Sequence, residues 1–219
     1  MYMCGNEVYD SIWMEDNKAD ELLRNVEGLL VTAKYGLEDL TVGLPPRRLA
    51  GLQNLVVFGR AVTSALQKLR SIEPDFDRWY EKYRQEMETD ELMKYFYELR
   101  SEILKEGTLK TAVRVDLKEM KFPEDLSRFL RPPNAKGFFI GDRFGGSGWE
   151  VQLANGSLDK YYVELPYDIG SVTLQFPDPP RHHKEQEIKD KSIEALGRLY
   201  FDYLSRMVGS ARDRFSTRS

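Results

Sequence analysis

Apolar residues recur every three or four positions through most of the first half of the chain, which is the spacing of amphipathic helices. The pattern predicts helices over residues 17–36, 46–71, 75–86 and 90–105. In the fourth helix Phe96 and Leu99 lie on the apolar face, so we expect both at the centre of a helical bundle. Gly107 follows this helix, at a position where glycine readily takes the left-handed conformation that ends helices.

The spacing of apolar residues changes after Gly107. Between residues 109 and 176, short runs alternate apolar with polar residues, which is typical of half-buried strands, and Asn155-Gly156 predicts a hairpin turn. Helical spacing returns at His183 and predicts a closing helix over residues 183–208. The basic, polar tail after that helix is expected to fray.

The expected fold class is therefore α+β: a mainly helical antiparallel bundle with a small antiparallel β-sheet inserted before the last long helix. Residues 1–16 are expected to form an N-terminal extension. Residues 17–219 would then be a single helical-bundle domain, with a β-insert at 109–176 and the closing helix at 183–208. The closing helix should return to the bundle, because its apolar stripe must be buried.

Composition narrows the classes of function. Of 219 residues, 41% are hydrophobic and 31% charged, which is a globular composition, and the net charge of -4 argues against a DNA-binding or membrane-binding protein. Cys4 is the only cysteine, which excludes internal disulfides and fits a reducing compartment. The acidic N-terminus is unlike a signal peptide, and no stretch approaches the roughly 20 apolar residues of a membrane span. We expect a cytoplasmic protein.

Three short motifs each have a functional and a structural interpretation. His182 and His183 are adjacent and cannot chelate a metal as an i, i+4 pair does, so we expect neither a metal nor a cofactor. The glycines of "GDRFGGSG" precede a strand rather than a helix, which favours a hairpin loop over a phosphate loop. In "RWYEKYR", residues 78–84, aromatic and basic residues interleave as on a single-strand nucleic-acid surface, but core packing is favoured.

The end of the fourth helix carries the most specific pattern. Arg100 is followed by Ser101 and, after three further residues, by Lys105, just before Gly107. This arrangement resembles the Arg-polar-x-x-x-His signature of HEPN domains, over the helical part of the chain. The resemblance implies a helical bundle that commonly dimerises. In active members it implies a metal-independent ribonuclease whose arginine and histidine act on a 2'-hydroxyl and the adjacent phosphate.

The sequence departs from that signature at two positions. Ser101 stands where asparagine, aspartate or histidine is usual, and Lys105 stands in place of histidine. A lysine with a pKa of about 10.4 stays charged at neutral pH, so it can hold a phosphate but is a poor base. On a regular helix Arg100 and Lys105 also point about 140° apart. The simplest interpretation is a solvated helix end, with Glu98 or Glu102 pairing Lys105.

We therefore predict a non-catalytic HEPN-like interaction or regulatory module, a homodimer, with Arg100, Ser101 and Lys105 as binding residues. Arg100 should pair with an acidic residue or contact a facing helix, and Lys105 should be exposed. The alternative is a metal-independent ribonuclease with Arg100 and Lys105 as catalytic residues. A third possibility is a small-molecule sensor in the crevice between sheet and bundle. The expected partner is a second copy of the chain, with another protein or RNA as further candidates.

Overall fold

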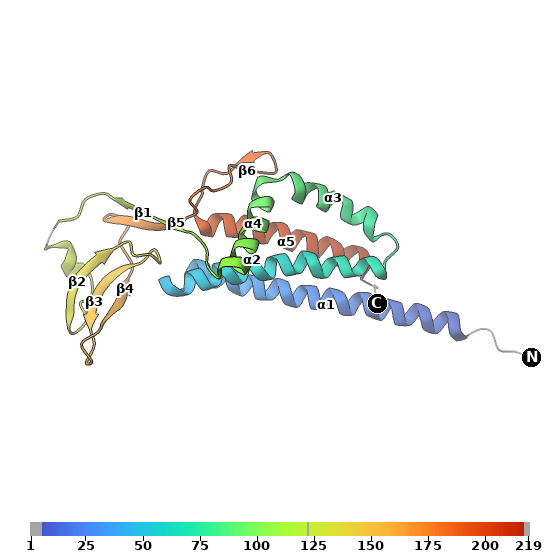
Figure 1. The fold of residues 1–219 in the computed structure, drawn as a ribbon, viewed down its shortest axis with the longest axis horizontal. Coiled ribbons are helices and arrows are strands. Elements are labelled where there is room, and N and C mark those ends of the chain that lie inside the picture. Colours follow the sequence, from blue (N-terminus) through green and yellow to red (C-terminus); the bar gives the residue numbers. More distant parts are fainter. Residues whose placement is uncertain (1–5, 122, 217–219) are drawn as a thin grey trace, which may run out of the picture.

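The computed structural model describes residues 6–121 and 123–216 and has the expected α+β fold (Figure 1). The helices of this part of the chain are α1 (Asn6–Val42), α2 (Pro45–Leu66), α3 (Phe76–Thr89), α4 (Glu91–Glu106) and α5 (Ile193–Phe215). A short 3₁₀ helix, η1 (Gln67–Ser71), continues α2. All four helices predicted in the first half are present. Helix α1 begins at Asn6, so the described residues of the expected N-terminal extension are helical.

Helices α1 and α2 pack with their backbones in close approach at two glycines. A Cβ atom on Gly36 would lie 2.5 Å from the main-chain nitrogen of Leu55 and 2.7 Å from the carbonyl oxygen of Gly51. A Cβ on Gly51 would lie 2.6 Å from the carbonyl oxygen of Gly36. The absence of side chains at both positions therefore sets how closely the two helices approach.

The main hydrophobic core lies between the helices and reaches from Ala19 in α1 to Phe215 in α5. Phe96 is fully buried and Leu99 is 4% exposed, as the helical spacing predicts. Among the described residues, the segment Pro45–Ser71 is long and apolar enough by composition to cross a membrane, contrary to expectation. The central helix of a soluble bundle passes the same test, and 44% of the apolar window is buried inside the protein.

The β region lies at one end of the molecule (Figure 1). A meander of β2 (Ala135–Ile140), β3 (Ser147–Gln152) and β4 (Leu158–Val163) forms a three-stranded antiparallel sheet. The hairpin between β3 and β4 turns at Gly156, whose φ is 85°. Strand β1 (Ala112–Leu117) pairs instead with β5 (Gly170–Gln175), in a two-stranded antiparallel ribbon.

The closing helix was predicted ten residues too early. His182–His183 (β6) pairs with Gln186–Glu187 (β7) in a tight hairpin, and α5 begins only at Ile193, after the cap Ser192. Ile188 is buried in the core although it is not helical, which explains why the apolar spacing extended the predicted helix. The tail does not fray at Gly209, because α5 continues to Phe215, which is 6% exposed.

Candidate functional site

The helix-end residues singled out by the sequence do not converge. Helix α4 is regular up to its cap, Gly107, whose φ is 70°, so Arg100 and Lys105 point about 140° apart. Both side chains are exposed, and the hydroxyl of Ser101 donates to the carbonyl of Tyr97 at 3.3 Å. Contrary to expectation, Arg100 has no ion-pair partner among the described residues. This geometry is that of a solvated helix end. A role of Arg100, Ser101 and Lys105 in binding remains a prediction.

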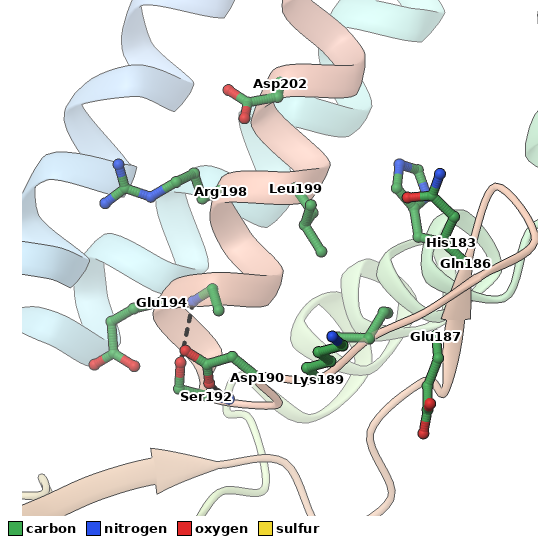
Figure 2. Close-up of a pocket in the computed structure, with 12 residues that line it drawn as sticks. His183, Gln186, Glu187, Lys189, Asp190, Ser192, Glu194, Arg198, Leu199 and Asp202 are labelled. Atoms are coloured by element: carbon green, nitrogen blue, oxygen red, sulfur yellow. Dashed lines mark hydrogen bonds between the residues drawn. The ribbon is translucent and has the colours of Figure 1, made fainter.

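A hollow of about 540 Å³ lies between the β6–β7 hairpin and the first turns of α5 (Figure 2). Figure 2 shows Glu194 and Arg198 pointing to one side of α5, with His183 on the other side. Burial raises the pKa of the Glu194 carboxyl. Because the charged side chains of this hollow diverge, they do not form a set that could act on one ligand atom.

His183 belongs to a clamp that fixes the hairpin to α4. Its Nδ1 lies 3.0 Å from the carboxylate of Asp90, which also accepts the main-chain N–H groups of Lys184 at 2.7 Å and Met93 at 3.0 Å. Burial alone would raise the pKa of Asp90, but these hydrogen bonds outweigh burial and hold the pKa below its usual value. Nε2 of His183 is buried and has no hydrogen-bond partner among the described residues. Asp90 is thus both the cap of α4 and the anchor of the hairpin.

A second pocket, of about 490 Å³, is a half-open hollow in the surface of the bundle between α2, η1, α3 and α4, with one residue from α5. We call it the tyrosine pocket. Its lining consists of three tyrosines, two methionines and eight polar or charged residues, in chain order Arg60, Thr63, Gln67, Arg70, Tyr80, Arg84, Met87, Glu88, Met93, Lys94, Tyr97, Glu98 and Tyr200. Tyr80, Met93 and Tyr200 are buried, whereas most of the charged residues are exposed, so the floor is aromatic and apolar and the rim is charged.

Packing against the core holds two of the tyrosines in place. Tyr200 stacks on Phe96 with ring centres 4.1 Å apart and planes 8° apart. Gly59 makes room for it, because a Cβ there would lie 2.6 Å from the Tyr200 ring. Tyr80 stacks on Phe76 at 5.2 Å. These contacts fix the orientation of the two rings at the floor of the pocket.

The tyrosine hydroxyls are polar groups of the pocket. The Tyr80 hydroxyl accepts a hydrogen bond from Nε2 of Gln67 at 3.1 Å. Burial raises the pKa of Tyr80, and it also raises the pKa of Tyr200 well above the usual value. Both hydroxyls therefore keep their protons at neutral pH and can donate hydrogen bonds.

The arginines of the pocket differ in their partners. Arg70 pairs with Asp77 at 2.6 Å, and Arg84 pairs with Glu81 at 2.6 Å and Glu88 at 2.7 Å. Arg60 is partly buried, lies over the ring of Tyr97 at 5.2 Å and donates to the hydroxyl of Thr63, but no carboxylate of the described residues pairs with it.

The sequence motifs did not identify this pocket, although one signal was present. Arg60 is the only charged residue between Arg48 and Lys68, in the most apolar helix of the chain. An isolated charged side chain in such a helix either pairs with a polar group of the protein or takes part in binding. Core packing, the favoured interpretation of "RWYEKYR", is confirmed for Tyr80, which is 5% exposed, and Arg84 on the same segment lines the pocket.

The fold defines the class: an α+β protein with a helical bundle and small antiparallel sheets between α4 and α5. Residues 47–125, which are 79 of the 219, match the family model described as Bacteriophage lambda protein ea47. The matched segment contains every lining residue of the tyrosine pocket except Tyr200. Comparison with curated proteins and with solved structures gives no match.

This match corrects the family assignment made from the sequence motif. The segment that carries the motif, within residues 47–125, matches the model of the ea47 family instead, so the resemblance to HEPN domains is wrong. The motif "RSEILK" misled because an arginine, a small polar residue and a later basic residue are common at the end of a solvated helix. The description of the ea47 family names a phage protein and no activity.

Proposed function

We propose that the chain is a non-catalytic regulatory module that binds a small molecule in the tyrosine pocket. The observation that carries this proposal is the pocket itself, a half-open hollow of about 490 Å³ in the bundle. Small-molecule sites are typically concave, about 300–1,000 Å³ in volume, and combine apolar walls with polar groups that orient the ligand. The tyrosine pocket has this volume, and it combines a floor of buried tyrosine and methionine with a guanidinium, Arg60, that no carboxylate of the described residues pairs.

A ligand in this pocket would stabilise one arrangement of the helices. Of the described residues of α3, only Phe76 and Tyr80 are buried, whereas α2 and α5 each bury a long row of side chains. The pocket is lined from α3 on one side and from α2 and α4 on the other. A molecule that contacts all three helices would favour the docked position of α3, and this differential binding is what a regulatory module requires.

The polar groups of the pocket favour binding over chemistry. Arg70 and Arg84 are already paired with carboxylates, and raised pKa values keep the hydroxyls of Tyr80 and Tyr200 protonated. Protonated hydroxyls orient a ligand through hydrogen bonds but do not act as bases at neutral pH. We therefore expect the ligand to be released unchanged.

A fragment screen followed by ligand-observed NMR tests this proposal. Hits should be lost in Met87→Trp, which fills the pocket, and kept in Leu130→Trp, which adds the same side chain at a site 76% exposed. Mass spectrometry should recover each hit unchanged after incubation. Hits that ignore Met87→Trp, or that map to the hollow beside His183, would contradict the proposal.

Self-association, a protein or RNA partner and a cytoplasmic location remain predictions from the sequence. Light scattering coupled to size-exclusion chromatography measures self-association directly. A mass near twice 25.5 kDa would support the predicted homodimer, and a mass near 25.5 kDa at micromolar concentration would contradict it.

A further inference from the structure

Arg60 distinguishes the tyrosine pocket from an ordinary apolar cavity. A guanidinium group carries five N–H donors in one plane. Among the described residues, the Arg60 group donates one hydrogen bond, to the hydroxyl of Thr63, and its central carbon lies 5.2 Å from the centre of the Tyr97 ring. The nearby ring stabilises the positive charge. Donors of Arg60 therefore remain for a ligand.

The charges around Arg60 set the charge of that ligand. Arg70 pairs with one carboxylate, and Arg84 pairs with two, Glu81 and Glu88. Lys94 and Glu98 have no ion-pair partner among the described residues, and their charges oppose each other at the exposed rim. The surroundings of Arg60 therefore bring no excess of positive charge, but its guanidinium is partly removed from water and no carboxylate of the described residues pairs with it, so an anion hydrogen-bonded to it is bound more strongly than at the surface.

The walls set the shape of the ligand. Tyr80 and Tyr200 each use one ring face to stack on a core phenylalanine, which fixes the orientation of both rings. Met87 and Met93 fill the space between helices with flexible thioethers, which make favourable contacts with aromatic rings. Rigid aromatic walls together with methionines favour a flat, aromatic ligand body.

We propose that the ligand of the tyrosine pocket is a small aromatic carboxylate, bound with its carboxylate on the guanidinium of Arg60 and its ring among Tyr80, Tyr97 and Tyr200. This inference rests on the proposed function and specifies its ligand. A carboxylate accepts two parallel N–H groups of one guanidinium, and Arg60 is the arginine of the pocket that no carboxylate of the described residues pairs. A phosphate dianion would bring twice the charge of a carboxylate to a pocket whose other arginines are already paired.

Calorimetry with matched compounds tests the inference on the full chain. The probes are indole-3-acetate and phenylacetate, their neutral amides, phenyl phosphate, and acetate as the anion without a ring. We expect the wild-type protein to bind each acid about tenfold or more tightly than its amide, since hydrogen bonds to a charged group are stronger than those between neutral groups. Acetate alone should bind at least tenfold more weakly than phenylacetate, because it lacks the ring.

Two arginine variants assign the preference to one side chain. Arg60→Gln should bind acid and amide equally, while Arg70→Gln, which changes a paired arginine of the same pocket, should keep the preference of the wild type. Arg60→Lys keeps the charge and should keep part of the preference, which excludes misfolding as the cause of the loss in Arg60→Gln. Circular dichroism checks that each variant is folded.

The outcomes separate this inference from the proposed function. If amides and acids bind the wild type equally, the pocket is a ligand site but Arg60 does not select an anion. If phenyl phosphate binds more tightly than phenylacetate, the carboxylate is the wrong anion. If none of the aromatic probes binds while fragment hits are still lost in Met87→Trp, this inference is overturned and the proposed function stands. If the fragment screen also gives no hit in the pocket, both are overturned.

Discussion

The helical bundle and the β region of this protein are stabilised in different ways. The bundle has a continuous core that includes side chains from all five α-helices. In the described β region the separate core consists of four buried residues, Phe129, Ala135, Trp149 and Ile169. Burial of apolar surface contributes most to the stability of the bundle, whereas the β region depends more on polar contacts.

Asp142 shows how the β region is held together. Its side chain is 5% exposed and accepts hydrogen bonds from the N–H groups of Phe144 and Gly146, from Lys160 at 2.8 Å and from the hydroxyl of Tyr162 at 2.7 Å. Burial would raise the pKa of Asp142, but these donors outweigh it and hold the pKa below its usual value. One carboxylate thus orders the glycine-rich loop and joins it to β4. The tyrosine pocket lies against the larger core, since its Tyr80 and Tyr200 rings pack on Phe76 and Phe96.

The largest effect is expected from emptying the bundle core. Phe96→Ala should cost about 3–5 kcal/mol and Leu99→Ala about 2–5 kcal/mol of unfolding free energy, because both side chains leave cavities. Phe129→Ala should release the β2–β4 sheet and leave the helices folded, because Phe129 belongs to the small separate core whereas Leu174 of β5 belongs to the bundle core. Urea unfolding followed by helical circular dichroism, together with the NMR indole signal of Trp149, separates these outcomes. If Phe129→Ala lowers the helical midpoint as much as Phe96→Ala does, the two regions unfold as one unit.

Two glycine substitutions in α1 should change the stability of the protein by smaller amounts and in opposite directions. Gly36→Ala should destabilise the protein by about 1–3 kcal/mol, because its Cβ meets the backbone of α2. Gly28→Ala lies on the same helix with no atom within 4 Å of the new Cβ, so it should stabilise the protein by about 0.5–1 kcal/mol. Thermal unfolding of both variants measures the difference. Equal shifts of the melting temperature would show that α1 and α2 do not approach closely at Gly36.

Asp90→Asn, which removes the charge, should lower the free energy of unfolding by about 1–2 kcal/mol at pH 7, because the cap of α4 and the anchor of the hairpin are both weakened. The sign of the pH dependence follows from the lowered pKa of Asp90. Its stabilising effect is complete above the unfolded pKa of about 3.9 and is lost as the pH falls through the folded value.

Urea unfolding of the wild type and Asp90→Asn between pH 7 and pH 3 measures this effect. The difference between the two proteins should shrink as the pH falls below about 4, where Asp90 takes up its proton. Asp159→Asn, an exposed aspartate on β4, serves as the control and should change stability little at any pH. A difference that does not shrink between pH 4 and pH 3 would contradict the clamp.

No effect is expected on RNA. Because the regular helix α4 separates Arg100 from Lys105, the purified protein should leave single-stranded RNA intact in EDTA. Neither Arg100→Ala nor Lys105→Ala should change that result. Cleavage that both substitutions abolish would show that a second subunit completes the site, and would support the ribonuclease alternative.

Local patterns in the sequence determined most of the helices, the hairpin at Gly156 and the end of α4 at Gly107. These features depend on spacing and on the conformations that single residues prefer, so neighbours along the chain suffice to predict them. The burial of Phe96 and Leu99 followed from the same periodicity. The predicted start of the last helix failed, because Ile188 is buried by tertiary packing rather than by a helix.

The tertiary structure alone decided which side chains share a site. Residues from α2, η1, α3, α4 and α5 meet in the tyrosine pocket, over a sequence separation that runs from Arg60 to Tyr200. The lone charge of Arg60 was visible in the sequence, but the lack of a carboxylate beside it was not. Ion pairs form across space, so whether a charge is neutralised depends on how the helices pack and not on the residues that flank it.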